Sequence, residues 1–226
     1  MENDAVSESV FKAVLFDLDG TLTNPCIGIT NSVIYALERL EYEVPPREEL
    51  RCFIGPPLAE SFRKYFGMDE QTAVEGVRLY REYFADRGIF ENKLMDGAEE
   101  LLCELRRRGT RIFLATSKPR EFTERIISHF GISEYFDYVG AATMDGRIGE
   151  KHEVILDVLE NTGANPNECL MVGDRLHDIV GAHKFGIKCC AVLCGFGSPE
   201  EFDEYGADFV CERLCEVADL VEKQTS

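Results

Sequence analysis

The chain is poor in positive charge and has no long apolar run. Its 24 Lys and Arg residues face 42 Asp and Glu residues, which gives a formal net charge of -18. Nucleic acid and anionic membrane both select basic surfaces, so we expect neither as a partner. No apolar segment approaches the roughly 18 residues of a membrane span. Residues 1–9 are polar and acidic, unlike a secretory signal, and we interpret them as a flexible tail.

The chain also lacks Cys-x-x-Cys pairs, a common spacing of metal-binding or redox cysteines. Its nine cysteines are an odd number in a chain without a recognisable signal peptide, which favours reduced thiols and a cytoplasmic location. With 226 residues and a hydrophobic fraction of 45%, the chain can bury a core without disulfides. This length is compatible with one core that carries an insertion.

Short apolar segments alternate with amphipathic helical segments over most of the chain. Leu101, Leu102 and Leu105 follow the helical period, for example, and Gly109 stands where a C-terminal cap is expected. Such alternation is typical of an α/β fold with a doubly wound parallel sheet. The expected strands cover residues 13–16, 111–115, 138–141, 169–172, 188–193 and 208–210.

One stretch, residues 25–92, interrupts this alternation. It shows no convincing strand, and Pro45-Pro46 and Gly55-Pro56-Pro57 separate its helical runs. We therefore expect a helical insertion over residues 23–94 and a core formed by residues 10–22 and 95–226. The expected helical runs of the insertion are residues 29–40, 47–53, 58–66 and 70–84.

Polar residues follow several of the expected strands. In an open α/β sheet, ligands bind beyond the carboxyl ends of the strands, so these side chains are expected to meet at one rim. Carboxylates, hydroxyls and ammonium groups would come together there. The residues are Asp17 and Asp19, Thr116, Ser117 and Lys118, Lys151 at the start of a helix, and Asp174 and Asp178.

The pair Asp17 and Asp19 illustrates what such a rim can do. In a regular strand the two side chains would point to opposite faces, but a turn at Gly20 allows them to converge. Two close carboxylates repel each other unless a cation or a shared proton intervenes. An oxygen-rich site of this kind suits Mg²⁺ together with a substrate phosphate. For the pair alone, an ordinary Asp-Gly turn at a strand end is an equally good interpretation.

The complete set of motifs separates these two interpretations. Asp17-Leu18-Asp19-Gly20-Thr21-Leu22, Thr116, Lys151 and Gly173-Asp174-Arg175-Leu176-His177-Asp178, in that order, resemble the haloacid dehalogenase-like superfamily. The resemblance runs from Ala13 through the whole chain. It implies a Rossmann-like core and a helical cap at the insertion. The insertion after the first motif is similar to that of the phosphoglycolate phosphatase-like branch, which includes proteins described as 5′-nucleotidases.

The resemblance implies a covalent mechanism for two of the carboxylates. Asp17 would attack phosphorus and form an aspartyl-phosphate. Asp19 would protonate the leaving oxygen and then deprotonate the water that hydrolyses the intermediate. Mg²⁺ would be held by the carboxylates of Asp17 and Asp174 and by the backbone carbonyl of Asp19, with Asp178 supporting the metal.

The resemblance also implies how the phosphoryl group is held. Thr116 would donate a hydrogen bond to its oxygens, and Lys151 would offset their charge. Lys118 also stands at a strand end and competes with Lys151, although an exposed loop charge is the plainer interpretation of Lys118. Ser117 and Lys118 are further candidates for substrate binding, as is Arg51, beside the Gly55-Pro56-Pro57 turn.

We therefore expect a Mg²⁺-dependent phosphatase for a small phosphorylated metabolite resembling phosphoglycolate, a nucleotide or a sugar phosphate. A dehalogenase would need neither Asp19 nor Asp174. A phosphomutase of the β-phosphoglucomutase type would share the motifs, but it usually has Val or Ile after the glycine, whereas Thr21 is typical of phosphatases. A binding protein without turnover is a third alternative, which the intact motifs disfavour.

The sequence leaves the substrate open, as well as the choice between a monomer and a homodimer. Specificity would depend on cap residues that carry no recognisable motif. We expect the cap to close over the core about hinges near residues 22–24 and 94–97, which would exclude water from the phosphoenzyme.

Overall fold

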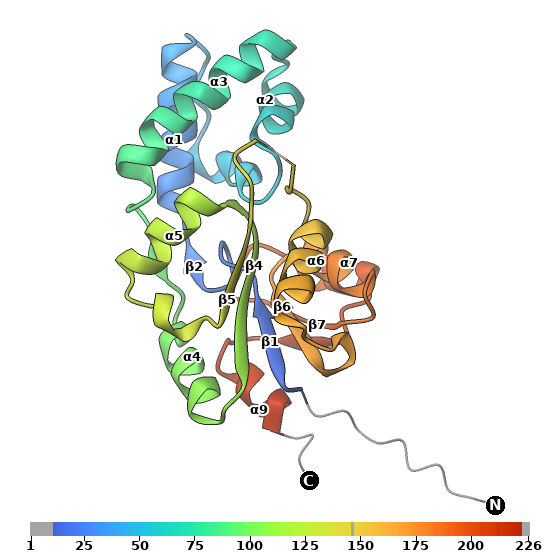
Figure 1. The fold of residues 1–226 in the computed structure, drawn as a ribbon. Helices are drawn as coiled ribbons and strands as arrows, with labels where there is room; N and C mark the ends of the chain where they lie inside the picture. The colour runs from blue at the N-terminus through green and yellow to red at the C-terminus, as the bar shows by residue number, and fades with distance from the viewer. Residues whose placement is uncertain (1–10, 146, 223–226) are drawn as a thin grey trace, which may run out of the picture.

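A six-stranded parallel sheet forms the centre of the molecule (Figure 1). The computed structural model describes residues 11–145 and 147–222, so the predicted tail at residues 1–9 lies outside the described residues. The strand order is β5-β4-β1-β6-β7-β8, which confirms the predicted doubly wound α/β fold. The strands are β1 (Ala13–Phe16), β4 (Arg111–Pro119), β5 (Tyr138–Ala142), β6 (Cys169–Gly173), β7 (Lys188–Val192) and β8 (Phe209–Cys211).

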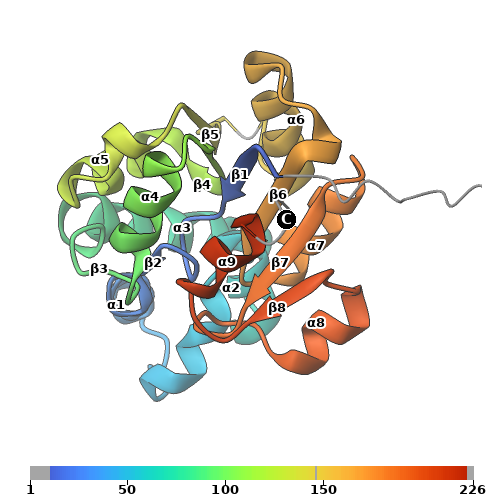
Figure 2. The ribbon, with the colours of Figure 1, turned by 90° about the horizontal axis from the view of Figure 1, so that it is seen from below.

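Helices cover both faces of this sheet, as Figure 2 shows from below. On β1, Val14 and Phe16 pack into the core beneath one set of helices, and Ala13 and Leu15 into the core beneath the other. All four residues are buried, as expected for a strand that is covered on both faces. The helices on the first face are α4 (Ala98–Arg107), α5 (Arg120–His129) and α9 (Glu216–Glu222), and those on the second are α6 (Lys151–Thr162), α7 (Leu176–His183) and α8 (Pro199–Tyr205).

Most element boundaries agree with the sequence patterns, and β4 is the main exception in the core. It continues to Pro119 instead of ending at Ala115, so Thr116, Ser117 and Lys118 belong to the strand. Its register against β5 shifts between Thr116 and Pro119. Thr116 still pairs with Ala141, and the shift takes Ser117 and Lys118 out of the regular strand pairing.

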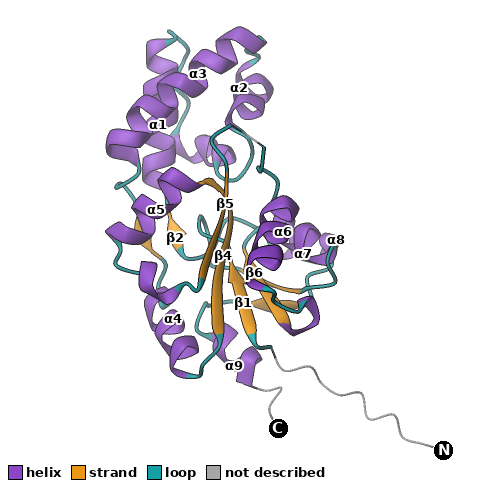
Figure 3. Cartoon of the chain, viewed as in Figure 1, coloured by secondary structure: helices purple, strands orange, loops and turns teal. Residues whose placement is uncertain are grey.

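The insertion folds as a helical layer beyond the carboxyl ends of the strands (Figures 1 and 3). The predicted helix over residues 47–53 is a 3-10 helix, and the predicted run over 70–84 ends one residue earlier and continues as a π-helix. Among the described residues, no helix is long and apolar enough to cross a membrane. The elements are α1 (Cys26–Arg39), η1 (Arg47–Phe53), α2 (Leu58–Phe66), α3 (Glu70–Tyr83) and η2 (Phe84–Gly88).

Two short strands join this helical layer to the core. β2 (Thr23–Asn24) pairs antiparallel with β3 (Lys93–Leu94), and the amide of Met95 donates to the carbonyl of Leu22 at 2.9 Å. The predicted hinges at residues 22–24 and 94–97 fall at this two-stranded sheet. The domain boundaries and the closing motion remain predictions.

Candidate active site

The turn after β1 sets Asp17 and Asp19 in different surroundings. The amide of Asp17 still donates to Val172 of β6, at 2.9 Å, whereas the amide of Gly20 donates to Thr23 at 2.7 Å within the turn. Gly20 has a φ of 90°, and a Cβ atom there would lie only 2.1 Å from Oδ2 of Asp174. The turn therefore requires glycine both for its backbone conformation and for the close approach of Asp174.

Lys151, the first residue of α6, lies against the side chain of Asp17. Its Nζ is 2.6 Å from Oδ1 of Asp17 and 2.9 Å from Oδ1 of Asp178, and it donates to the carbonyl of Ala115 at 2.8 Å. Only 5% of the side chain is exposed. Burial by itself would lower the pKa of Lys151, but the carboxylates of Asp17 and Asp178 outweigh it and raise that pKa. Lys151 is therefore a charged ammonium group fixed beside Asp17.

Three carboxylates converge on one point next to this lysine. Asp17, Asp174 and Asp178 each offer an oxygen, and these oxygens lie within 4.8 Å of one another. Asp174 follows β6, and its Oδ2 accepts from the amide of Phe196 at 2.8 Å. Asp178 lies in the first turn of α7, where its Oδ2 accepts from the amides of Asp174 and Arg175, each at 3.1 Å. Backbone amides thus orient the carboxylates of Asp174 and Asp178, and the three side chains still offer oxygens that face one another.

The electrostatics of this cluster favour a bound divalent cation. Burial, together with the charges of Asp178 and Asp17, raises the pKa of Asp174 well above its usual range. Burial likewise raises the pKa of Asp178 to about 6, although Lys151 acts in the opposite direction. Three ionised carboxylates and one ammonium group leave two negative charges in excess in a buried place, which is costly without a counterion. The oxygen donors and this charge fit Mg²⁺.

Asp19 has other partners. Its Oδ2 forms an ion pair with Nζ of Lys118, and its Oδ1 accepts from Oγ1 of Thr23 at 3.4 Å. The side chain of Lys118 is 8% exposed, so its interpretation as an exposed loop charge is wrong. Nζ of Lys118 also lies 4.9 Å from the ring centroid of Phe84, which is the first residue of η2. Lys118 and Lys151 therefore each hold one of the two carboxylates of the first motif.

The remaining predicted site residues differ in their burial and in their distance from the carboxylate cluster in the hydrogen-bond network. Thr116 is buried at the end of β4, and its Oγ1 accepts from the amide of Lys118 at 3.2 Å. Ser117 is exposed, and Arg51 is an exposed residue of η1. Among the described residues, neither of these two has a side-chain hydrogen bond or ion pair that joins it to the carboxylate cluster. Arg47, on the same short helix as Arg51, instead donates to Asn31 of α1 at 2.8 Å.

Two aromatic residues of the insertion face this site and were not predicted from the sequence. Tyr80 is 6% exposed, and its pKa is raised well above the usual range by burial and by the negative charge of Asp19. The ring of Tyr80 stacks on Phe84, with centroids 5.4 Å apart. Their spacing of four residues matches any buried stripe of a helix, so the sequence offered only a weak signal for them.

Arg175 also connects the insertion to the core, and this contact was not predicted from the sequence. Its Nη1 donates to the carbonyl of Ile54, at 3.3 Å, in the loop after η1. Its Nε donates to Glu201 of α8 at 3.0 Å, and Glu201 in turn accepts from the amide of Leu176 at 2.7 Å. Arg175 thus connects the loop that carries Asp174 to the insertion.

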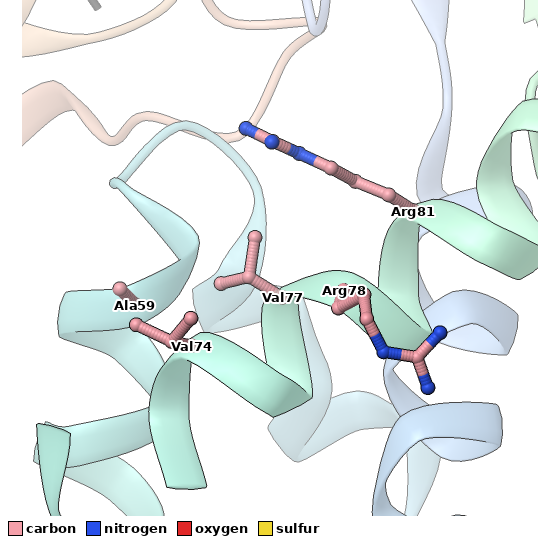
Figure 4. Close-up of a pocket in the computed structure, with 5 residues that line it drawn as sticks. All are labelled: Ala59, Val74, Val77, Arg78 and Arg81. Carbon is pink, nitrogen blue, oxygen red and sulfur yellow. The ribbon is translucent and has the colours of Figure 1, made fainter. Parts of the chain in front are cut away.

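An open pocket of about 310 Å³ lies on the insertion, between α2 and α3 (Figure 4). Arg78 is held by Glu75 at 2.8 Å and by Glu82 at 3.1 Å. Figure 4 shows the Arg81 side chain extended away from α3. The pocket contains none of the predicted site residues, and its lining consists of Ala59, Val74, Val77, Arg78 and Arg81.

Known proteins resemble this chain over nearly its full length. A 5′-nucleotidase of Pseudomonas aeruginosa is 42% identical over 209 residues, which cover 92% of this chain and 95% of that protein. Tyrosine-protein kinase PtkA of Mycobacterium tuberculosis is 38% identical over 191 residues, which cover 84% of this chain and 65% of that protein. A crystal structure of a predicted phosphatase from Clostridium acetobutylicum has a TM-score of 0.90 at 39% identity and covers 95% of this chain and 100% of that one.

The sequence also matches a family profile over the first strand, the insertion and most of the sheet. The profile is described as Haloacid dehalogenase-like hydrolase, and the match covers residues 14–192. Together with the relatives, it confirms the predicted enzyme class, a phosphatase. The chain belongs to the haloacid dehalogenase-like hydrolase family.

Proposed function

We propose that this phosphatase is Mg²⁺-dependent and hydrolyses a small phosphate monoester through an aspartyl-phosphate at Asp17. The observation that carries the proposal is the contact of 2.6 Å between Lys151 and Asp17, beside two further buried carboxylates. This arrangement offers a nucleophile together with the positive charge that a transferring phosphoryl group needs.

The first half of the reaction would break the ester bond. One oxygen of Asp17 is held by Lys151, and the other attacks phosphorus while the bond to the leaving oxygen breaks. Asp19 enters this step in its protonated form and gives that proton to the leaving oxygen, so the leaving group departs as an alcohol. Lys151 and the hydroxyl of Thr116 stabilise the negative charge on the phosphoryl oxygens.

The second half would release phosphate. Asp19, now a carboxylate, takes a proton from a water molecule, whose oxygen attacks phosphorus as the bond to Asp17 breaks. Phosphate leaves, and Asp17 and Asp19 return to their starting states. Asp17, Asp174 and Asp178 would hold the Mg²⁺, together with the carbonyl of Asp19. The ion supplies positive charge to the phosphoryl oxygens and to the nucleophile.

The substrate and the setting form part of this proposal. The chain carries a net charge of -18, and its nine cysteines are an odd number without a Cys-x-x-Cys pair. Both facts support a small phosphorylated metabolite as substrate and the cytoplasm as location. The name of the Pseudomonas relative makes nucleoside 5′-monophosphates the first class to test. For the oligomeric state we propose a monomer or a homodimer, the two alternatives that the sequence analysis left open.

Phosphate release from a panel of esters tests this function. The panel contains nucleoside 5′-monophosphates, phosphoglycolate, sugar phosphates and p-nitrophenyl phosphate, each with Mg²⁺ or with a chelator. We expect release with Mg²⁺ only, and a loss of about 10³-fold or more in Asp17→Asn. Asp203→Asn, an exposed carboxylate of α8, is the matched control and should match the wild type.

Two results would contradict this function. Equal release by the wild type and Asp17→Asn would remove Asp17 as the nucleophile. Conversion of a sugar phosphate to its isomer, without free phosphate, would instead identify a phosphomutase.

A further inference from the structure

We propose that Lys118 is a positioning residue for the acid Asp19, and that Phe84 of the helical insertion keeps Lys118 in place. The inference rests on the proposed phosphatase function and deepens it. It assigns to Lys118 a task different from that of Lys151, and it gives the insertion a direct part in the orientation of a catalytic carboxylate.

The burial of Lys118 is the first observation. A lysine side chain that is 8% exposed needs a partner for its charge, because an isolated ammonium group is costly to remove from water. The partner is Oδ2 of Asp19, whose side chain is itself only 18% exposed. The second oxygen of Asp19 accepts from Thr23. Each oxygen of this carboxylate therefore has its own donor, which fixes its direction. In the acid form, Oδ2 still accepts from Lys118, and Oδ1 carries the proton that the leaving oxygen receives.

The second observation is the ring of Phe84 beside the same ammonium group. Nζ of Lys118 lies 4.9 Å from the ring centroid, within the range of a cation–π interaction. Phe84 is buried and stacks on Tyr80, and its ring also meets Phe122 of α5 at 5.3 Å. Because the insertion supplies the ring and the core supplies both ion-pair partners, the position of Asp19 depends on how the insertion sits on the core.

Lys118 could instead bind the substrate phosphate directly. A phosphate ligand would stabilise all esters to a similar extent, since every ester presents the same phosphoryl group. A residue that orients the acid would matter most when the leaving oxygen needs a proton. An alkyl ester releases a poor leaving group that needs this proton, whereas p-nitrophenyl phosphate releases a stable phenolate that does not.

The test compares kcat/KM of Lys118→Met for two esters: the best alkyl ester of the panel above and p-nitrophenyl phosphate. This parameter reports the steps up to formation of the phosphoenzyme, where the leaving group is expelled. We expect a loss at least about tenfold larger for the alkyl ester than for p-nitrophenyl phosphate. Lys118→Arg keeps the charge and should recover part of the difference.

Two further variants locate the effect. Phe84→Leu should show the same preference with a smaller size, about two- to fivefold. Lys64→Met is the matched control, because Nζ of Lys64 also lies over an aromatic ring of the insertion, 5.1 Å from the Tyr65 centroid, but Lys64 is exposed. It should leave both esters unchanged. Thermal unfolding of each variant separates a loss of fold from a loss of orientation.

The possible outcomes are distinct. Equal losses for the two esters in folded Lys118→Met would overturn the proposal and make Lys118 a phosphate ligand. Unchanged kinetics in Lys118→Met or in Phe84→Leu would overturn it as well. If Lys118→Met does not fold, Phe84→Leu and Lys118→Arg decide by the same ratio. A wild type that releases phosphate from no ester would refute the proposed function instead.

Discussion

The rim of the sheet and the helical insertion above it are built in opposite ways. At the rim, charged side chains are buried and held by backbone groups, as Asp178 is by two amides. On the insertion, aromatic rings such as those of Tyr80 and Phe84 face the rim, and arginines such as Arg81 lie exposed. The rim thus fixes charge in space, whereas the insertion supplies shape and apolar contact. This difference suits a division in which the core performs the chemistry and the insertion governs access and orientation.

Among the substitutions that follow, the loss of Lys151 from the rim should reduce activity most. In Lys151→Met, the attacking carboxylate and the phosphoryl oxygens lose their fixed cation, so we expect kcat to fall by about 10³-fold. The three carboxylates then lack their ammonium partner, so the free energy of unfolding without Mg²⁺ should fall as well. Phosphate release and thermal unfolding measure the two losses.

The control for this variant is Lys184→Met, which removes an exposed lysine at the end of α7. It should change neither activity nor unfolding. A Lys151→Met protein that retains most of its kcat would show that Lys118 alone supplies the positive charge, and the contrast between the two lysines would then be wrong.

The core was largely predictable from the sequence because its elements depend on local patterns. Apolar runs such as residues 13–16 are typical of buried strands, as the structure has it. The profile match over residues 14–192 confirms the family that the contiguous first and last motifs predicted. The convergence of Asp17, Lys151 and Asp178 was expected because parallel strands end at one rim. Motifs of this kind predict the chemical role of a residue as well as its place in the fold.

The insertion was less predictable because its patterns do not identify partners. A helical period over residues 70–84 indicates that Tyr80 and Phe84 are buried, but it does not say against what. The same holds for Lys118, whose ion pair with Asp19 depends on the irregular end of β4 and on the turn at Gly20. The helical period likewise did not reveal that residues 47–53 form a 3-10 helix.

Mg²⁺ bound at the rim should raise the free energy of unfolding by an amount that depends on pH. The pKa of Asp178 is about 6 in the folded chain and 3.8 ordinarily, so the folded state binds more protons between these values. The free energy of unfolding of the metal-free protein should therefore fall as pH rises through about 6. Mg²⁺ binds the ionised carboxylates, so its stabilising effect should be larger at about pH 7.5 than at about pH 5.

Thermal unfolding with Mg²⁺ or with a chelator, at both pH values, measures this effect. Asp178→Asn removes one of the two carboxyl groups whose pKa is raised, so the metal-free protein should lose part of its dependence on pH, and Asp174 should retain the rest. A gain from Mg²⁺ of equal size at both pH values would contradict the assignment of the metal to this cluster.

The smallest effect is expected from Arg175, where the two regions meet. In Arg175→Met the side chain keeps much of its apolar packing but loses its hydrogen bond to Ile54 and its ion pair with Glu201. Because a hydrogen bond of this kind contributes about 1 kcal/mol, we expect kcat/KM to fall by about two- to tenfold. Hydrogen exchange in the segment that contains Ile54 should become faster, since the loop loses its link to the core.

Glu201→Gln provides the control for this link. A glutamine still offers an oxygen to the amide of Leu176, so the start of α7 stays intact while the charge that holds Arg175 is removed. If Arg175 connects the insertion to the metal-binding loop, both variants should speed exchange around Ile54, and Arg175→Met should do so more strongly. Unchanged exchange in Arg175→Met would mean that other contacts, among them the ring of Phe84 against Phe122, hold the insertion on the core, which would make Phe84→Leu the more damaging of the two substitutions.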